Sequence, residues 1–377
     1  MDFNYFEERD INVVEEHRRR VNHQIHERFR IRDGNDPLNM SIPMFEQLYR
    51  MPQHAVAELC DILRPFLPQH TSPQQLPLMR KVLITLGFYA SGSYQRMLGR
   101  CIDCAVSQTT VSRCLREITT ALNHEQILNR FIRFPSTREE RAPIIQRNEQ
   151  LGLPRVLGLM DGFLLKLSNL PHDRERQAFF CRKGYLALNN QIICDADLRI
   201  LNVDARWPGS LTDNQIWQAS TARRVVEQAY YEDRCWLLGD SCYFTAPWLH
   251  IPIIHAQPGT PEFEYTRLHC RCRNAVERCI GVLKARWRVL GIDRCINYRD
   301  PAYAGMIVNA CCVLHNYCIG RRIPNPPPLL ENEDNDFYPE VNDLPINVQE
   351  RGLEEMQFLI NFANDRRLNR HNIVNVL

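Results

Sequence analysis

The sequence predicts an α/β domain preceded by an all-helical domain. From residue 41 to 150, apolar residues recur at helical spacing. From residue 151 to 320, a run of short apolar segments is followed by a helix, a further strand and closing helices, which is typical of an α/β layer arrangement. The length of 377 residues fits two or three domains, and a hydrophobic content of 44% is ordinary for a globular chain.

Residues 1–40 form a polar N-terminal arm. Within it, residues 17–32 read HRRRVNHQIHERFRIR, which is a basic and potentially helical segment. A solvated helical face is the favoured interpretation, and a nuclear-import or nucleic-acid patch is the alternative. The formal net charge of +2 does not by itself indicate a nucleic-acid partner, so the local distribution of charge is more informative.

Residues 41–150 are expected to form the helical domain, with helices over 44–51, 55–67 and 76–92. Residues 93–122 then predict a helix-turn-helix, in which a short helix, a turn and a longer helix follow one another. In such a motif the second helix enters the major groove of DNA. A plain helical hairpin that packs on the next domain is the alternative.

The expected second helix of this motif, residues 107–122, is amphipathic. Ser107 is a suitable N-cap, and Val111, Leu115, Ile118 and Leu122 make one apolar stripe. The polar side is predicted to contact DNA through Gln108, Thr109, Ser112, Arg113 and Arg116.

Residues 151–320 are expected to form the second domain, which opens with the apolar stretch 155–168. Two short strands are predicted here, joined at Asp161. An ionised carboxylate within an apolar run is costly unless a partner compensates its charge. A turn or cap role for Asp161 is the ordinary alternative, since Asp commonly serves in both.

The following elements are a hairpin over 188–195 and 199–205, a helix capped by Thr212, and a strand that ends on Asp240. The last two elements are expected to be helices over 271–290 and 301–319.

The predicted helix 271–290 carries one acid, Glu277, among many bases. Glu277 lies about 100° around the helix from Val276, which belongs to the apolar stripe, so its carboxylate is at the edge of the buried face. A simple ion pair with Arg273 is one interpretation of this acid. The other is a metal site, since Asp161, Asp240 and Glu277 are three isolated acids of the kind that hold Mg²⁺.

Fifteen cysteines do not form a regular framework, and we expect free thiols in a reduced intracellular protein. A zinc site at Cys101 and Cys104 is disfavoured because a second CxxC pair is missing. We expect neither a secretory signal nor a membrane span.

Five sequence blocks resemble the Harbinger (PIF) transposase-derived nucleases. They occur in order within residues 73–320 and follow the expected helix-turn-helix. One position departs from the pattern, because Phe163 and Leu164 follow the Asp-Gly pair where the family's transposases usually have Thr-His. The blocks are LGLMDGF, CDADLRILNVDARWPGSLTDNQIW, LLGDSCYF, NAVERCIGVLKARWRVL and NACCVLHNYCI.

The resemblance implies a ribonuclease-H-like fold, with a mixed sheet flanked by helices, and a D-D-E metal site. Carried over by position, the catalytic and metal-binding triad is Asp161, Asp240 and Glu277, with Asp213 as an accessory metal ligand. Two Mg²⁺ or Mn²⁺ ions would then support hydrolysis of a phosphodiester bond.

The basic residues of the long helix, Arg273, Lys284 and Arg288, are expected to contact the DNA backbone. The resemblance implies a Myb-like DNA-binding protein as a partner. A homo-oligomer is a further expectation, and no membrane is expected as a partner. The expected location is the nucleus and cytoplasm.

Residues 321–377 form an acidic, Pro-rich tail with an expected terminal helix at about 351–370. Docking to the body, dimerisation and shielding of the basic helix are its candidate roles, and a solvated tail is the favoured interpretation.

Three function classes follow. A metal-dependent DNA nuclease is favoured, a DNA-binding or regulatory protein without turnover is the alternative, and a structural adaptor is the third class.

Overall fold

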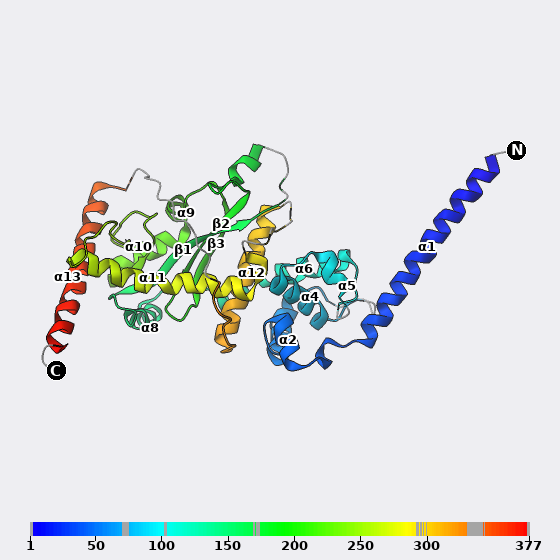
Figure 1. Cartoon of the computed structure of the whole chain (residues 1–377), viewed down its shortest axis with the longest axis horizontal. Helices are drawn as coiled ribbons and strands as arrows, with labels where there is room; N and C mark the ends of the chain where they lie inside the picture. The colour runs from blue at the N-terminus through cyan, green and yellow to red at the C-terminus, as the bar shows by residue number, and fades with distance from the viewer. Residues whose placement is uncertain are drawn as a thin grey trace. The chain divides into compact units, whose positions relative to one another are not determined.

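The computed structural model divides into two compact units, Met1–Ala121 and Leu122–Leu377, and each is described by itself (Figure 1). The structure describes residues 3–69, 75–101, 104–168, 170, 174–291, 294, 296, 298, 300–329, 342 and 344–374.

The first unit is helical, as the periodicity predicts. A long N-terminal helix is followed by shorter helices, and the elements expected at 44–51, 55–67 and 76–92 are present within a few residues. The helices are α1 (Phe3–Gly34), α2 (Ile42–Tyr49), α3 (Gln53–Leu63), α4 (Leu78–Ser91), α5 (Gln95–Arg100) and α6 (Gln108–Leu122), with 3₁₀ turns η1 (Pro37–Asn39) and η2 (Arg64–Phe66).

Helices α5 and α6 pack closely across their connection. A Cβ on Gly99 would lie 2.7 Å from the carbonyl oxygen of Val106, so this approach requires glycine. Ser107 caps α6 as predicted, because its Oγ accepts a hydrogen bond of 3.1 Å from the Thr110 amide. Helices α5 and α6 are therefore where the sequence predicts them. The helix-turn-helix and the reading of DNA by α6 stay predictions.

The second unit is built on a mixed five-stranded sheet in the order β3-β2-β1-β4-β5. Strand β2 is antiparallel to both β1 and β3, whereas β4 is parallel to β1 and β5 is parallel to β4. The α/β fold with a mixed sheet flanked by helices is thereby confirmed. The strands are β1 (Val156–Lys166), β2 (Ala187–Cys194), β3 (Ile200–Pro208), β4 (Trp236–Leu238) and β5 (Leu249–His250).

One expectation about these strands is wrong. The stretch predicted as two strands is the single strand β1, and it pairs with β2 without interruption from Leu159 to Lys166. Gly162, which follows the predicted junction at Asp161, pairs with Gln191 in this ladder. Asp161 therefore lies inside a strand and is neither a turn residue nor a cap.

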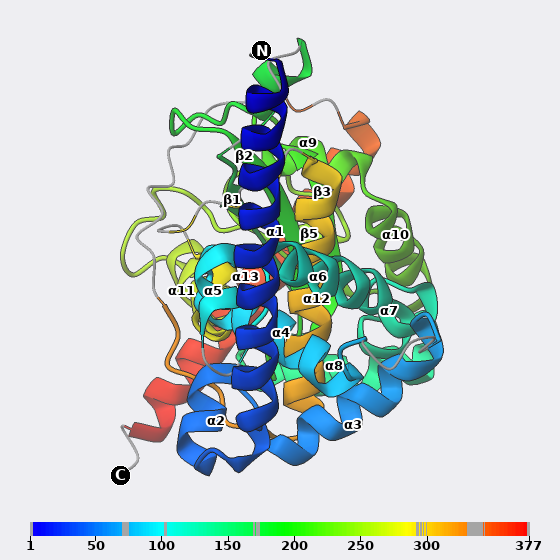
Figure 2. The same ribbon diagram turned by 90° about the vertical axis from the view of Figure 1, so that its right-hand side faces the viewer.

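Helices cover the sheet of the second unit. Helix α12 contacts β3, and α11 contacts β1 (Figures 1 and 2). The helices are α7 (Glu125–Phe131), α8 (Arg138–Glu149), α9 (Asp213–Ala219), α10 (Thr221–Asp233), α11 (Pro261–Arg286), α12 (Pro301–Gly320) and α13 (Ile346–Val374), with 3₁₀ turns η3 (Arg174–Phe179) and η4 (Arg288–Leu290).

The units divide after residue 121 and not near residue 150, because α7 and α8 belong to the second unit. Asn148 of α8 donates a hydrogen bond of 3.0 Å to the carbonyl of Val156 on β1. The same side chain accepts one of 2.8 Å from the amide of Ala196, in the β2–β3 turn. A single buried amide thus ties α8 to the sheet.

Helix α12 is the one helix in the described ranges that is long and apolar enough to cross a membrane. The 18-residue window that meets this criterion is 78% buried inside the protein, as expected for a core helix.

Helix α13 packs against α11, so the terminal helix is docked and the expected solvated tail is wrong for this part. Its Glu355 is 3% exposed and accepts hydrogen bonds from Tyr230 (2.8 Å) and Arg234 (2.9 Å). Most of the acidic segment before the helix, residues 330–341, lies outside the described residues.

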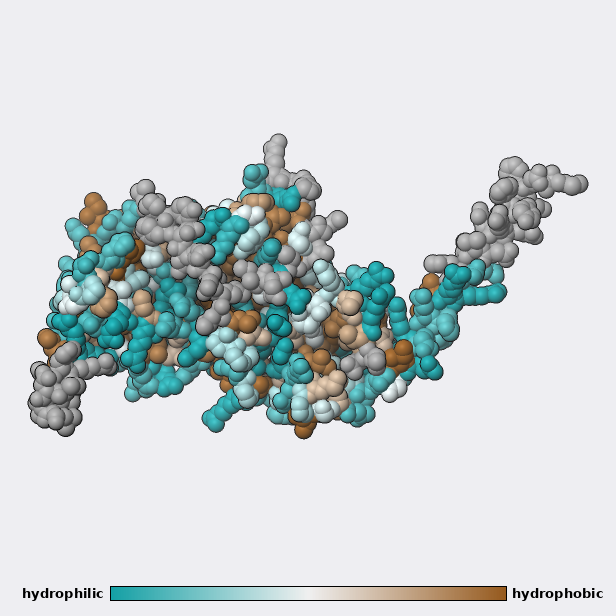
Figure 3. All heavy atoms as spheres, viewed as in Figure 1, coloured by the Kyte–Doolittle hydropathy of each residue, from teal (hydrophilic) through white to brown (hydrophobic). Residues whose placement is uncertain are grey.

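Hydrophilic residues predominate on the drawn face of the second unit and on the described part of α1, as Figure 3 shows. Hydrophobic residues gather in small, scattered spots, which is ordinary for a protein surface.

Candidate active site

Strand register brings the first two predicted acids together. Strands β1 and β4 are parallel neighbours in which Leu159 pairs with Leu238. Asp161 and Asp240 each follow their paired leucine by two residues, so both carboxylates lie at the same level of the sheet. Their side chains are 14% and 9% exposed. Two adjacent, mostly buried carboxylates repel each other unless cations compensate them.

Local hydrogen bonds orient the Asp240 carboxylate where the chain leaves β4. Its Oδ1 accepts hydrogen bonds from the backbone amide of Ser241 and, at 3.1 Å, from the Ser241 hydroxyl. The Cys242 Sγ lies 3.7 Å from Oδ2. Burial first, and then the charges of Asp240 and Asp213, raise the pKa of the Cys242 thiol to about 12. Cys242 is therefore a neutral neighbour of this acid and not a thiolate.

The third predicted acid, Glu277, lies on α11, which crosses beside β1 and β4. Its side chain is 48% exposed, so this side of the acid cluster faces solvent. Helix α11 begins at Pro261, ten residues before the predicted start, with Thr260 as its N-cap. The longer helix anchors its first turns on the body of the unit, where Tyr265 and Leu268 are buried.

Arg273 joins the three acids. Its Nη2 lies 3.0 Å from Asp161 Oδ2 and 2.8 Å from Glu277 Oε1, and its Nη1 lies 3.0 Å from Asp240 Oδ1. The side chain is 11% exposed. Burial disfavours the charged guanidinium, but the three carboxylates outweigh that effect and raise the Arg273 pKa above the ordinary value.

The expected ion pair between Arg273 and Glu277 is thus present, together with two pairs that helical spacing does not indicate.

Asp213, the predicted accessory ligand, lies next to the cluster. A Cβ on Gly162 would meet both Asp213 carboxylate oxygens at 2.6 Å, so the carboxylate packs on the backbone directly after Asp161. Asn189 on β2 donates a hydrogen bond of 2.8 Å to Asp213 Oδ1. The structure therefore brings all four predicted metal-binding acids into one region.

Tyr243 and Gln191 are site residues that sequence reasoning missed. Gln191 donates hydrogen bonds to the Tyr243 hydroxyl (2.9 Å) and to the backbone carbonyl of Asp213 (3.1 Å). Burial raises the Tyr243 pKa well above its ordinary value, and the charges of Asp213, Asp161 and Asp240 raise it further. The signal was present, since Gln191 and Asn189 are polar residues at alternate positions of a fully buried strand.

The three basic residues predicted to contact the DNA backbone lie in three different environments in the structure. Lys284 is 2% exposed, and its ammonium lies 5.2 Å from the ring centre of Phe163, so it differs from the expected surface base. Arg288 is exposed and lies in η4, beyond the end of α11. Arg273 lies among the acids. Of the three, Arg288 is the one placed on the surface.

In the first unit, the predicted DNA-contacting face of α6 is accessible. Its five polar residues line one shallow depression together with Gln95 of α5. The residues brought together are Gln108, Thr109, Ser112, Arg113 and Arg116.

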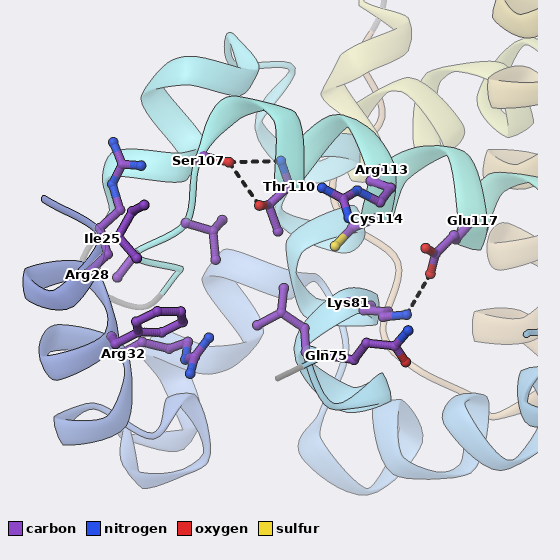
Figure 4. Close-up of a pocket in the computed structure, with 14 residues that line it drawn as sticks. Ile25, Arg28, Arg32, Gln75, Lys81, Ser107, Thr110, Arg113, Cys114 and Glu117 are labelled. Carbon is purple, nitrogen blue, oxygen red and sulfur yellow. Dashed lines mark hydrogen bonds and ion pairs between the residues drawn. The ribbon is translucent and has the colours of Figure 1, made fainter. Parts of the chain in front are cut away.

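A second, deeper pocket lies between α1, α4 and α6, as Figure 4 shows. Helix α1 contributes Arg28 and Arg32, and α6 contributes Arg113, which also lines the shallow depression. The lining acid Glu117 is paired with Lys81 at 2.6 Å. The guanidinium groups thus make the pocket cationic overall, and Arg113 connects it to the polar face of α6.

The donor set of the acid cluster fits a divalent cation. Three carboxylates from different elements converge on one cationic group, so the guanidinium marks where positive charge is stabilised. Oxygen donors of this kind are the ligands of Mg²⁺ and Mn²⁺. As they stand, the described residues contain no group of three or more acidic, His or Cys side chains that could hold a metal ion. Arg273 lies between the carboxylates and accounts for this arrangement.

The fold and the acid cluster define a class of protein, the DDE superfamily endonucleases, and residues 160–316 match that family model. Endonucleases of this class generally use divalent metals. The matched range contains Asp161, Asp213, Asp240 and Glu277.

Sequence similarity to known proteins identifies the family within this class. The Homo sapiens protein "Putative nuclease HARBI1" is 31% identical over 299 residues, which cover 78% of this chain and 81% of that protein. Its Xenopus laevis counterpart is 30% identical, covering 79% and 82%. The Arabidopsis thaliana "Protein ALP1-like" is 24% identical, covering 73% and 70%. The chain belongs to the family of Harbinger transposase-derived nucleases. No solved structure matches it.

Proposed function

We propose that this protein is a divalent-metal-dependent DNA endonuclease that hydrolyses phosphodiester bonds at a D-D-E site. The convergence of Asp161, Asp240 and Glu277 on a single cationic group supports this function most directly. The nuclease names of its relatives support the same reaction class. The strand order β3-β2-β1-β4-β5, antiparallel and then parallel, also fits the expected ribonuclease-H-like fold.

In this proposal each acid has a defined task. A bound Mg²⁺ or Mn²⁺ pair would activate water and stabilise the leaving oxygen of the phosphodiester. Asp161 and Asp240 would hold the metal from the buried floor of the site, where the sheet fixes their separation. Glu277 would hold it from the exposed side, through which a DNA strand can approach. Asp213, fixed by Asn189, would be the accessory ligand.

DNA binding would use both units. The polar face of α6 would read bases in the major groove, and Arg28, Arg32 and Arg113 of the adjoining pocket would attract phosphates. In the second unit the exposed Arg288 would contact the backbone.

The second candidate function is a DNA-binding or regulatory protein that keeps the fold without turnover. One observation favours it, because Arg273 satisfies the three acids without any metal. We also propose a Myb-like DNA-binding partner, a location in the nucleus and cytoplasm, and homo-oligomerisation.

A plasmid-nicking assay with Mg²⁺ or Mn²⁺ tests the proposed function. Asp240→Asn and EDTA should each abolish nicking. Asp197→Asn is the matched control, because Asp197 is 52% exposed and pairs with Arg147 on another part of the unit. Nicking that Asp240→Asn leaves unchanged would reject the triad. Absence of nicking by the wild-type protein, even beside a Myb-like partner, would favour the function without turnover.

A further inference from the structure

Arg273 is held by its three acid partners but is not fully satisfied. Its two Nη atoms contact Asp161, Asp240 and Glu277 at 2.8–3.0 Å. Its Nε atom is buried and has no hydrogen-bond partner in the part of the chain that the structure describes. A buried donor that is left unpaired is destabilising, because its lost hydration is not replaced. The guanidinium therefore compensates the negative charge of the three acids, but the site does not satisfy all of its hydrogen-bond donors.

A metal ion and this guanidinium exclude each other. Mg²⁺ binds carboxylate oxygens at about 2.0–2.1 Å, whereas the same oxygens lie 2.8–3.0 Å from the Nη atoms of Arg273. Two cations this close to each other would also repel, and the repulsion is stronger beside the mostly buried Asp161 and Asp240 than it would be in water. The carboxylates can close on a metal only after Arg273 has moved.

The released side chain needs another anion. Arg273 leaves the acids at the cost of a charge-assisted hydrogen bond to Asp161 and of its ion pairs with Asp240 and Glu277. A phosphodiester oxygen is an equivalent acceptor, since the planar guanidinium matches phosphate geometry. Glu277, one turn after Arg273 on α11, is 48% exposed, so the side of the cluster nearest to Arg273 is open to a DNA strand.

We propose that Arg273 is an exchangeable counter-cation that couples DNA binding to metal binding. This inference rests on the proposed function of the same site. Without DNA, the guanidinium neutralises Asp161, Asp240 and Glu277 and opposes metal binding. A DNA phosphate takes up the guanidinium, and the carboxylates are then available to the metal.

The exchange has a thermodynamic consequence that a purely structural ion pair lacks. If DNA raises the affinity for metal, metal must raise the affinity for DNA by the same factor. Couplings of this kind are typically 5- to 150-fold. A purely structural ion pair would keep the guanidinium on the acids with or without DNA and metal. It would therefore add nothing to the coupling between DNA affinity and metal affinity.

The test measures Mn²⁺ binding to the full-length protein by electron paramagnetic resonance of the free ion, with and without a 30-base-pair duplex. Arg273→Gln removes the counter-cation. Arg278→Gln is the matched control, because it removes one exposed positive charge from the same helix. DNA alone is titrated with Mn²⁺ to correct for ions that bind the duplex.

Arg273→Gln should bind Mn²⁺ at least about tenfold more tightly than wild type without DNA, in the range of ordinary couplings. The duplex should then raise the Mn²⁺ affinity of wild type and of Arg278→Gln several-fold more than that of Arg273→Gln. A DNA effect of equal size in Arg273→Gln and Arg278→Gln would overturn the coupling and leave the nuclease proposal intact. Failure of every variant to bind Mn²⁺, with or without DNA, would overturn both.

Arg273→Lys covers the case in which Arg273→Gln does not fold. An ammonium keeps the charge but is a single point and cannot span three carboxylates as the guanidinium does. Its hold on the acids is weaker, so Mn²⁺ should bind Arg273→Lys more tightly than wild type. Equal affinity, in protein whose circular dichroism spectrum matches wild type, would contradict the exchange.

Discussion

The Nη2 atom of Arg273 lies 3.0 Å from Oδ2 of Asp161, although the two residues are 112 positions apart in the chain. This contact joins helix α11 to strand β1 at the point where the acid cluster forms. A mostly buried carboxylate needs such a partner, because an uncompensated charge in this environment is costly. The same contact therefore has two consequences: it stabilises the protein without metal, and it opposes the binding of metal.

Replacing Asp161 by Asn should abolish metal-dependent cleavage and leave DNA binding largely in place. The substitution keeps the shape of the side chain but removes one negative charge from the metal-binding set. Metal ions supply several kcal/mol of transition-state stabilisation, so the cleavage rate should fall at least about 100-fold. Nicking and fluorescence anisotropy on the same preparation measure the two properties. Cleavage at the wild-type rate would remove Asp161 from the triad.

Replacing Arg113 by Ala should weaken binding to a preferred DNA site more than binding to random DNA. Arg113 is exposed on α6 and lines both the shallow depression and the deeper pocket of the first unit. A base-contacting Arg is worth about 1–3 kcal/mol of discrimination. A selected site and a scrambled duplex are compared by anisotropy. Equal losses on the two duplexes would assign Arg113 to the backbone and remove α6 as the reading helix.

Replacing Arg28 and Arg32 by Gln should reduce the dependence of DNA affinity on salt. Both residues line the cationic pocket beside α6 (Figure 4). Each phosphate contact contributes about 0.9 to the slope of log affinity against log salt, so the double variant should lose nearly 2. Arg30→Gln is the control, because Arg30 is exposed on the same helix and pairs with Glu27 at 2.8 Å. An equal fall in the control would show only a general effect of charge.

The sequence predicts the acids better than it predicts their arrangement. Apolar runs that end on Asp161 and Asp240 are visible in the sequence. Their adjacency depends on the pairing of β1 with β4, whose paired residues are 79 or 80 positions apart. Local periodicity carries no information on such a register. It indicates the Arg273–Glu277 pair, because these residues are one helical turn apart, and it cannot indicate the two aspartates on the same guanidinium.

Tertiary packing also decides the two elements that were predicted wrongly. Asp161 was read as the junction of two strands, yet the strand is continuous, and the missing side chain of Gly162 admits the Asp213 carboxylate beside it. The tail was read as solvated, although a helix was expected at about 351–370. Met356 and Leu359 of this helix are buried, as is Glu355, whereas Leu353 and Leu368 are exposed. The local sequence does not indicate the surface against which the helix packs.

Replacing Glu355 by Gln should destabilise the second unit. Glu355 is 3% exposed and links α13 to α10 by accepting hydrogen bonds from Tyr230 and Arg234. Loss of a hydrogen-bonded charge typically lowers the free energy of unfolding by about 1–3 kcal/mol. We expect a loss in the lower half of this range, because the Arg234 side chain is 60% exposed and solvent weakens its ion pair. Urea unfolding measures the difference. The neighbouring Glu354 is exposed, so Glu354→Gln is the control and should unfold as wild type does.

Stability should fall as the pH is lowered from about 6.5, because two histidines are buried in the neutral form. Burial lowers the His250 pKa to about 3, helped by His269, and burial lowers the His269 pKa to about 4. In the unfolded chain both pKa values return to about 6.5. Between the unfolded and folded values the unfolded state binds more protons, so the free energy of unfolding decreases as pH decreases.

Each histidine should contribute a slope of about 1.4 kcal/mol per pH unit below 6.5. Urea unfolding at pH 7 and pH 5 measures this loss, and His250→Gln should reduce the slope by about half, since one of the two groups is removed. His54→Gln is the control, because it removes one exposed histidine, on α3. A wild-type slope that His250→Gln leaves intact would mean that carboxylates, and not the buried histidines, set the acid sensitivity of the fold.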